Sequence, residues 1–258
     1  AREELGITGD EGLVDEEEEE KAEDEDDDEI DPAILAEREK RKAERKMNVQ
    51  LFGEGKYHLI PSFFRMIMFL KKKKEEFSIV FRSFGTELEN AIYEYNRFCT
   101  GEHPCYNGRN NTPLVKIDGS KNQKDIRIME PCQKLQFYRP TEDIQKGLVM
   151  VTGGVERVAS YHEMQGIDED DEVEVIRNHL EIFTHQMETL KKYGSMAISE
   201  DYPGWKEGGF QNNRAKLLLV DQADYVTQHI FFDDNADDGD ECIVDVRDIV
   251  TGEKIDQR

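Results

Sequence analysis

The sequence predicts an α/β fold: a Rossmann-like, mainly parallel sheet flanked by helices, with an inserted β-rich and helical subdomain. Three observations predict it. A helical pattern, a β-branched apolar run and a second helical pattern follow one another over 62–101. Short strand-like runs separated by Gly, Pro and Asn fill 106–165. Further apolar runs then alternate with turns toward the carboxyl end.

The charge of the chain is concentrated at its amino end. The formal net charge is −24, and residues 1–31 hold 18 Asp and Glu against Arg2 and Lys21, which leaves −8 for the rest. Such a segment cannot bury enough apolar surface to fold, so we expect 1–31 to be a disordered acidic tail. The balance argues against nucleic-acid binding, which needs clustered Lys and Arg.

The uncharged runs argue against a membrane protein. The longest apolar stretch, 62–70, is interrupted by Arg65 and is too short to span a bilayer. No signal peptide opens the chain. The four cysteines form no CxxC pair, which favours reduced thiols. We therefore expect an intracellular, cytoplasmic protein without a membrane partner.

The expected domain, 49–258, is preceded by a charged helix or linker, and helix signals locate the elements of its first half. Residues 32–48 predict a charged, exposed helix that begins at Pro32. Residues 62–76 predict a helix capped by Ser62, and 77–85 a buried strand.

A second capped helix follows this strand. Residues 86–101 begin with Thr86, have Glu89 in the capping-box position and end at Gly101. The interval 102–194 is the expected insertion.

The second half is predicted from one long helix and four apolar runs. Residues 169–194 have the pattern of an amphipathic helix that ends at a glycine. The four runs, expected as strands, are 195–199, 215–221, 229–234 and 242–248.

Polar side chains stand at the ends of three predicted strands. Ser83 follows the first, Lys216 begins another, and Asp233 and Asp234 end the run at 229–234. Ligands of parallel α/β sheets collect at the carboxyl ends of the strands. Carboxylates hold Mg²⁺ and Lys neutralises phosphoryl oxygens, so these residues predict a site for Mg²⁺ and phosphate.

The order of these residues resembles that of the haloacid dehalogenase-like superfamily, which consists mostly of Mg²⁺-dependent phosphohydrolases on a Rossmann-like sheet. The resemblance covers about 50–250. It places Ser83 in the second motif and Lys216 in the third, both as phosphate-holding residues. "IFFDDN" is similar to the fourth motif, with Asp233 and Asp234 at the metal. The family also often carries a cap between its second and third motifs, and 102–194 occupies that interval.

The first motif of this family is missing from the chain. It consists of an apolar strand ending in Asp-x-Asp, whose first Asp is the nucleophile, and nothing before Ser83 fits it. In a second alignment, "VFRSFGTEL" is a decayed first motif in which Arg82 and Phe84 replace the aspartates, and Ser199 is the second-motif hydroxyl. The first alignment is preferred because a helix of the expected kind precedes Ser83.

These observations lead to two hypotheses. In the first, the chain is a phosphatase-like pseudoenzyme with Mg²⁺ as its cofactor and a phosphorylated small molecule or protein as its ligand, inactive because the covalent step has no nucleophile. Because the chain starts at Ala1 rather than Met, an upstream segment could supply that motif. In the second, the chain is a noncatalytic interaction or scaffold protein whose acidic tail binds a basic partner.

Three other sites were weighed. Acidic residues over 234–245 could form an irregular calcium site, although they fit an EF-hand loop poorly. "CTGEHPC" (99–105) contains His103 and could bind zinc, but structural thiols are favoured because no second clustered pair exists. Trp205, the only tryptophan, lies in a turn-rich stretch that either packs as a turn or covers the crevice.

Overall fold

The computed structural model describes most of the chain after the predicted acidic tail, which lies outside the described residues. The described ranges are 32–48, 55–109, 114–141, 143–144, 148–152, 174–233 and 243–255.

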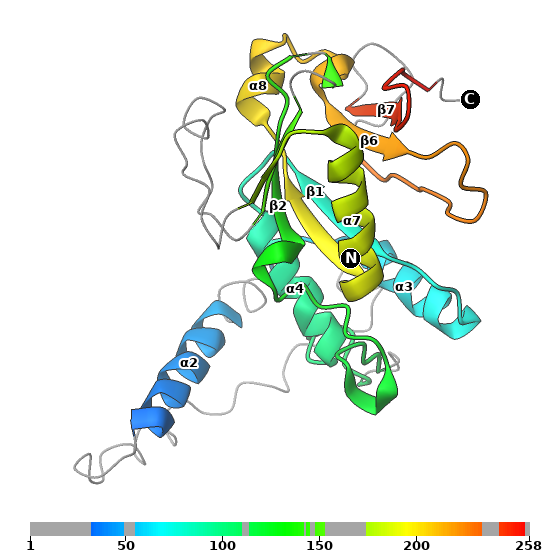
Figure 1. Cartoon of the computed structure of the whole chain (residues 1–258). Coiled ribbons are helices and arrows are strands. Elements are labelled where there is room, and N and C mark those ends of the chain that lie inside the picture. Colours follow the sequence, from blue (N-terminus) through cyan, green and yellow to red (C-terminus); the bar gives the residue numbers. More distant parts are fainter. Residues whose placement is uncertain are drawn as a thin grey trace.

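The described residues form an α/β fold around a mixed sheet of five strands (Figure 1). The strands are β1 (Ile79–Ser83), β2 (Lys134–Tyr138), β3 (Val149–Thr152), β4 (Glu174–Ile176) and β5 (Ser195–Ser199). Their order is β1-β5-β2-β3-β4. The pairs β1–β5 and β5–β2 are parallel, whereas β2–β3 and β3–β4 are antiparallel. The sheet is therefore mixed, and the predicted Rossmann-like parallel sheet is not confirmed.

A second sheet pairs β6 (Lys216–Val220) with β7 (Val244–Asp248), in parallel. The predicted strands at 195–199, 215–221 and 242–248 are therefore confirmed as β5, β6 and β7. The predicted insertion, 102–194, supplies β2, β3 and β4, and these pair directly or through one another with β5.

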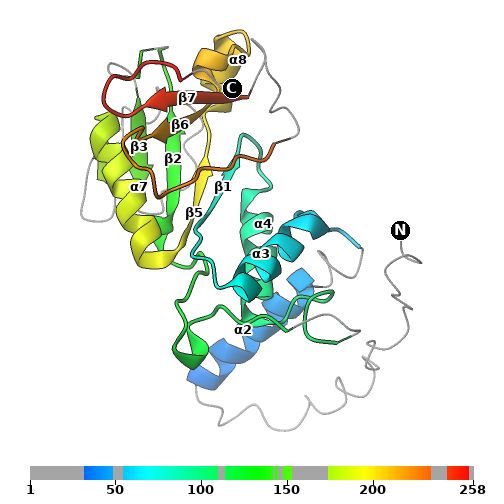
Figure 2. The same cartoon turned by 90° about the vertical axis from the view of Figure 1, so that its right-hand side faces the viewer.

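Helices cover both faces of the large sheet (Figures 1 and 2). Helices α3 (Pro61–Lys73) and α4 (Leu88–Thr100) pack on one face, and α7 (His179–Tyr193) packs on the other. Helix α8 (Tyr202–Glu207) follows β5, and α2 (Pro32–Asn48) lies apart from the sheet in Figure 1. Short 3-10 turns are η4 (Ser120–Asn122), η5 (Pro131–Gln133) and η6 (Asn212–Arg214).

The alternation of side chains along β5 explains the two cores. Ala197 faces the core formed with α3 and α4, which includes Phe64 and Phe98. Met196 and Ile198 face the opposite core, formed with β2, α7 and β6. One buried strand thus serves both faces, and its residues are apolar throughout its centre.

The predicted helix starts at Ser62 and Thr86 are wrong. Helix α3 begins at Pro61, whose ring needs no hydrogen-bond donor in the first turn, and Ser62 lies inside the helix. The N-cap of α4 is Glu87, which makes no side-chain capping bond. The predicted end is confirmed, because Gly101 takes a left-handed φ of 78° at the C-cap.

Helix α7 is shorter than the predicted helix at 169–194. The Asn178 side chain caps it by accepting from Leu180 N at 2.9 Å, and residues Glu174–Ile176 form β4 instead. Gly194 ends the helix as predicted, with a φ of 79°.

The predicted buried strand at 229–234 is wrong for its described residues, 229–233. They lie outside any assigned strand, and the side chains of Ile230 and Phe232 are 64% and 71% exposed. Phe231 alone packs inward, against the small core around Val244. The apolar run at 229–233 therefore joins neither sheet, and it contacts the β6–β7 unit through Phe231.

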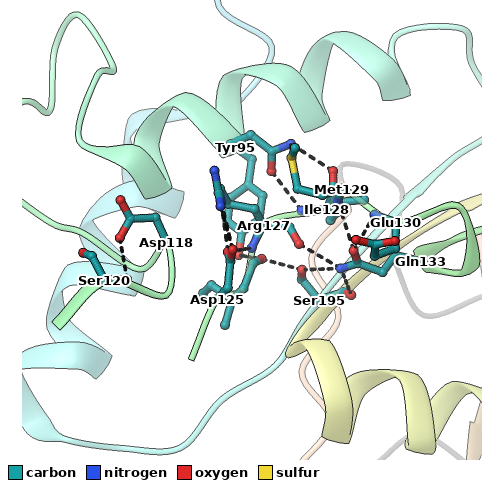
Figure 3. Close-up of polar contacts among 12 residues, drawn as sticks. Tyr95, Asp118, Ser120, Asp125, Arg127, Ile128, Met129, Glu130, Gln133 and Ser195 are labelled. Atoms are coloured by element: carbon teal, nitrogen blue, oxygen red, sulfur yellow. Dashed lines mark hydrogen bonds and ion pairs between the residues drawn. The ribbon is translucent and has the colours of Figure 1, made fainter. Parts of the chain in front are cut away.

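A stretch of irregular backbone between α4 and β2 is held by polar contacts (Figure 3). Tyr95 and Ser195 both donate to the carbonyl of Ile126, at 3.0 and 2.5 Å. The Gln133 amide donates to the carbonyls of Arg127 and Ser195, at 2.8 and 3.0 Å. These bonds satisfy the carbonyls of Ile126 and Arg127, which lie outside any assigned strand, and tie the segment to β5 through Ser195.

Candidate functional site

The carboxyl ends of β1 and β5 lie side by side. The two strands pair in register from Ile79 opposite Ser195 to Ser83 opposite Ser199. Beyond this pair, Glu200 N donates to the carbonyl of Ser83 at 2.8 Å. The residues that follow the two strands are therefore brought together, as expected for parallel neighbours.

Ser83 itself has a local role in the chain turn. Its Oγ accepts from Gly85 N at 2.9 Å. A hydroxyl two residues before a backbone donor commonly closes such a turn.

Arg82 reaches from the end of β1 into the protein interior. Its Nε lies 2.5 Å from Glu200 Oε1, and its Nη1 donates to the carbonyl of Leu217 at 2.5 Å. The side chains of Arg82 and Glu200 are 8% and 2% exposed. This ion pair ties β1, the end of β5 and β6 together.

The environment of Glu200 shifts its pKa. Burial raises the pKa of this carboxyl above its ordinary value, and the opposing effect of Arg82, followed by those of Lys216 and Arg139, does not cancel it. Three cations thus act on one buried carboxyl at this edge of the sheet.

Lys216 and Asp233 meet as the sequence predicted, but they bind each other. Lys216 Nζ lies 2.7 Å from Asp233 Oδ2, and both side chains are largely buried. The same ammonium lies 5.4 Å from the centre of the Phe84 ring. Asp234, the second predicted metal carboxylate, lies outside the described residues.

A third ion pair lies behind these two. Arg139, which follows β2, binds Asp245 of β7 at 2.7 Å and donates to the carbonyl of Ala215 at 2.7 Å. Asp245 is completely buried and also accepts from Arg247 at 2.8 Å. Burial lowers the pKa of Arg139 from its ordinary value, more than Asp245 raises it.

We call these three ion pairs the ion-paired edge. Its side chains are Arg82, Glu200, Lys216, Asp233, Arg139 and Asp245. Each carboxylate has a cationic partner within the protein, and each pair joins segments that are distant in sequence. Buried pairs of this kind are strongly destabilising to break, whatever their net contribution.

The described residues do not form a magnesium site. Among them, no group of three or more His, Cys, Asp or Glu side chains is arranged to hold a metal ion. Asp233, the one predicted ligand within the described ranges, directs its carboxylate to an ammonium. The Mg²⁺ prediction therefore stays a prediction, and no chemical step is assigned to a metal.

Aromatic residues cover one side of the ion-paired edge. Trp205 of α8 stacks on Phe84, with ring centroids 4.6 Å apart and planes 5° apart. Tyr202 and Phe210 contact Trp205 edge to face, and each remains more than 40% exposed. The tryptophan stretch therefore packs directly over the end of β1.

The contacts of His103 argue against the zinc alternative. His103 Nε2 lies 3.1 Å from Glu94 Oε1, and its Nδ1 accepts from Cys105 N at 3.1 Å. Glu94, fully buried, also accepts from the backbone N–H groups of His58 and Leu59 at 2.7 and 3.1 Å. Both ring nitrogens are thus engaged. The calcium candidate at 234–245 falls mostly outside the described residues.

Sequence reasoning missed Glu200 and Arg139, and it considered Asp245 only as part of the calcium candidate at 234–245. A signal existed only for Glu200, since "SED" places two carboxylates directly after a predicted strand. Arg139 and Asp245 are 106 positions apart. Arg139 follows β2 of the large sheet and Asp245 lies in β7 of the small one, so no local pattern links them.

Comparison with known proteins yields no relative: no family model, no curated protein and no solved structure matches the chain. Within the described ranges, every helix is too short or too polar to cross a bilayer.

Proposed function

We propose that this domain is a Rossmann-like, haloacid dehalogenase-like scaffold related to Mg²⁺-dependent phosphohydrolases, and that it is noncatalytic. The observation that carries the proposal is Arg82 at the end of β1, ion-paired to Glu200 at the end of β5. A guanidinium there offers five donors and no lone pair, so it cannot act as a nucleophile.

The geometry favours the second alignment to that family. The Ser83 hydroxyl serves a turn. Arg82 instead donates to the carbonyl of Leu217, next to Lys216, and lies over the ring of Phe231, two residues before Asp233. Arg82 then stands in place of the nucleophilic Asp, and Ser199 in the second-motif position. Lys216, which the resemblance assigns to a phosphoryl oxygen, neutralises Asp233 instead.

Two measurements on the same preparation test this proposal: calorimetric titration with Mg²⁺, and hydrolysis of p-nitrophenyl phosphate with and without Mg²⁺. We expect no saturable heat and no turnover above the blank. Asp233→Asn is the control variant, because it removes the one described metal-ligand candidate. Saturable Mg²⁺ binding that this variant abolishes, or Mg²⁺-dependent turnover, would contradict the proposal.

The acidic composition of residues 1–31 favours a second candidate, an interaction protein that captures a basic partner. The test compares the full chain with a chain lacking 1–31 for retention on a poly-lysine resin at low salt. We expect retention to fall on deletion. Retention that survives the deletion would exclude the acidic segment as the binding element.

A further inference from the structure

An open apolar groove lies between α3 and the segment that begins at Leu114. Its volume is about 480 Å³, and its lining residues are Met68, Phe69, Lys71, Lys72, Leu114 and Val115. Phe69 and Leu114 are 56% and 52% exposed. Two large apolar side chains that line one groove and remain half-exposed indicate a binding surface more strongly than isolated apolar residues do.

The walls of this groove are held in place by hydrogen bonds. Lys71 Nζ donates to the carbonyl of Lys116 at 3.0 Å and to the side chain of Gln123. Ile117 N donates to the carbonyl of Cys99 at 2.8 Å. The second wall is therefore anchored to both α3 and α4, so the groove is formed before any ligand arrives.

The rim of the groove is basic. Lys73 Nζ lies 5.7 Å from the centre of the Phe69 ring, so cationic and apolar groups share one surface. Residues 71–76 and 114–121, which form and flank the two walls, contain the lysines Lys71, Lys72, Lys73, Lys74, Lys116 and Lys121 and the acidic residues Glu75, Glu76 and Asp118. Part of this positive charge offsets the negative end of the α3 dipole. The remaining excess would attract an acidic ligand.

We propose that residues 10–20 of this chain occupy the groove. In "DEGLVDEEEEE", Leu13 and Val14 stand between Asp10 and Glu11 on one side and six consecutive carboxylates on the other. The two apolar side chains fill the groove beside Phe69 and Leu114, while the carboxylates flank them over the lysine rim. The segment therefore matches the groove in apolar character and in charge.

The connecting chain is long enough for this contact. Residues 21–60 separate the segment from α3, and α2 accounts for 17 of them. A helix of that length spans about 25 Å, and the other residues reach up to about 3.3 Å each when extended. This inference is independent of the first proposed function, since it involves neither the ion-paired edge nor a metal, but it shares residues 10–20 with the second candidate.

Zero-length carbodiimide cross-linking of the full chain, read by mass spectrometry, tests the proposal. It joins carboxylates of 10–20 to lysines in direct contact with them. The internal reference is Lys206, an exposed residue of α8. Figure 1 shows α8 at the opposite end of the domain from α3. We expect cross-links to Lys72, Lys73 and Lys74 to exceed those to Lys206 about tenfold, the effect of burying roughly two methylene groups.

Two variants separate groove binding from general charge attraction. Leu13→Ser with Val14→Ser, and separately Leu114→Ser, keep every charge and remove apolar contacts, and Leu114 is half-exposed, so the fold tolerates its replacement. We expect each to bring the groove cross-links down to the Lys206 level. Cross-links spread evenly over the lysines, or unchanged by these variants, would overturn the proposal.

A mixture of ¹⁴N- and ¹⁵N-labelled chains identifies the source of the bound segment. We expect cross-links within single isotopes only. Mixed-isotope cross-links at the groove would overturn the intrachain contact, because they would show that the segment comes from a second copy of the chain.

Discussion

The core between the sheet and helices α3 and α4 is held by apolar packing, whereas the ion-paired edge is held by charge. Phe64, Ile67, Tyr95 and Phe98 are at most 1% exposed, and the Phe64 and Phe98 rings lie 4.8 Å apart. The ion-paired edge joins β1, β5 and β2 to the β6–β7 unit through guanidinium and ammonium groups. The stability of the apolar core should therefore depend on side-chain volume, and that of the ion-paired edge on charge and pH.

The buried thiol of Cys99 gives the largest expected effect. Burial raises its pKa to about 12 from an ordinary value near 9.0. At neutral pH its thiolate fraction is then about 1,000-fold lower than that of an ordinary thiol. We expect a disulfide reagent to modify Cys99 only on unfolding, while the less buried Cys105 reacts in the native chain. Peptide mass mapping after timed labelling measures both, and native modification of Cys99 at the Cys105 rate would contradict this packing.

Breaking the third ion pair comes next. Arg139→Met leaves the buried Asp245 with one guanidinium partner, Arg247, in place of two. We expect a loss of about 3 kcal/mol of unfolding free energy, the lower end of the cost of breaking a buried pair. Urea denaturation of variant and parent provides the measurement.

The matched control is the double variant Arg139→Met, Asp245→Leu, in which both charges are removed together. We expect it to recover most of the loss, since apolar replacement of a whole buried pair is close to neutral. A double variant as unstable as the single one would show that the carbonyl contacts of Arg139, not the pair, hold this region.

The pH dependence of the edge follows from Glu200. Its pKa is raised in the folded chain, so folding is favoured by proton binding. The corresponding stability is fully present below the ordinary Glu pKa and is lost as pH rises through the raised folded value. The difference in unfolding free energy between the parent and Glu200→Gln should therefore shrink as pH rises from the ordinary Glu pKa through the raised folded value. Denaturation curves at several pH values test this expectation. A difference that grows with pH would contradict it, because it would show that the charged form of Glu200 stabilises the fold.

The smallest effect is expected at an exposed ion pair near the apolar core. Asp125 binds Arg127 at 2.7 Å, and both side chains are partly exposed. Asp125→Asn should cost no more than about 1 kcal/mol. A loss of unfolding free energy as large as that of Arg139→Met would contradict the account, because exposed and buried ion pairs would then contribute equally to stability.

Local sequence patterns predicted the strands with clear apolar runs and the helix ends with a glycine. The apolar runs located β1, β5, β6 and β7, and the two left-handed glycines, Gly101 and Gly194, ended their helices as expected. The start of α3 was misplaced because Pro61 suits the first turn better than Ser62. The N-cap of α4 is Glu87, which makes no side-chain capping bond and so gives no local signal. Helix α7 starts later than predicted because Asn178 caps it. The run at 229–233 failed as a strand because a strand needs a partner, and apolar composition does not supply one.

The candidate site was predictable in part. The order of Lys216 and Asp233 in the sequence predicted their proximity, but not that they neutralise each other. Arg82 and Glu200 are 118 positions apart, and only the in-register pairing of β1 with β5 brings them into contact. Pairing between distant strands is the part of the structure that a reading by local pattern does not contain.

A double-mutant cycle on Arg82 and Glu200, with Arg82→Met, Glu200→Gln and the two combined, tests most directly the claim that charge pairing closes this edge. We expect Arg82→Met alone to be the most unstable variant, and a coupling of about 2 kcal/mol or more in urea denaturation at neutral pH. A coupling near zero would contradict the account, because the two side chains would then lie together without holding the strand ends in place.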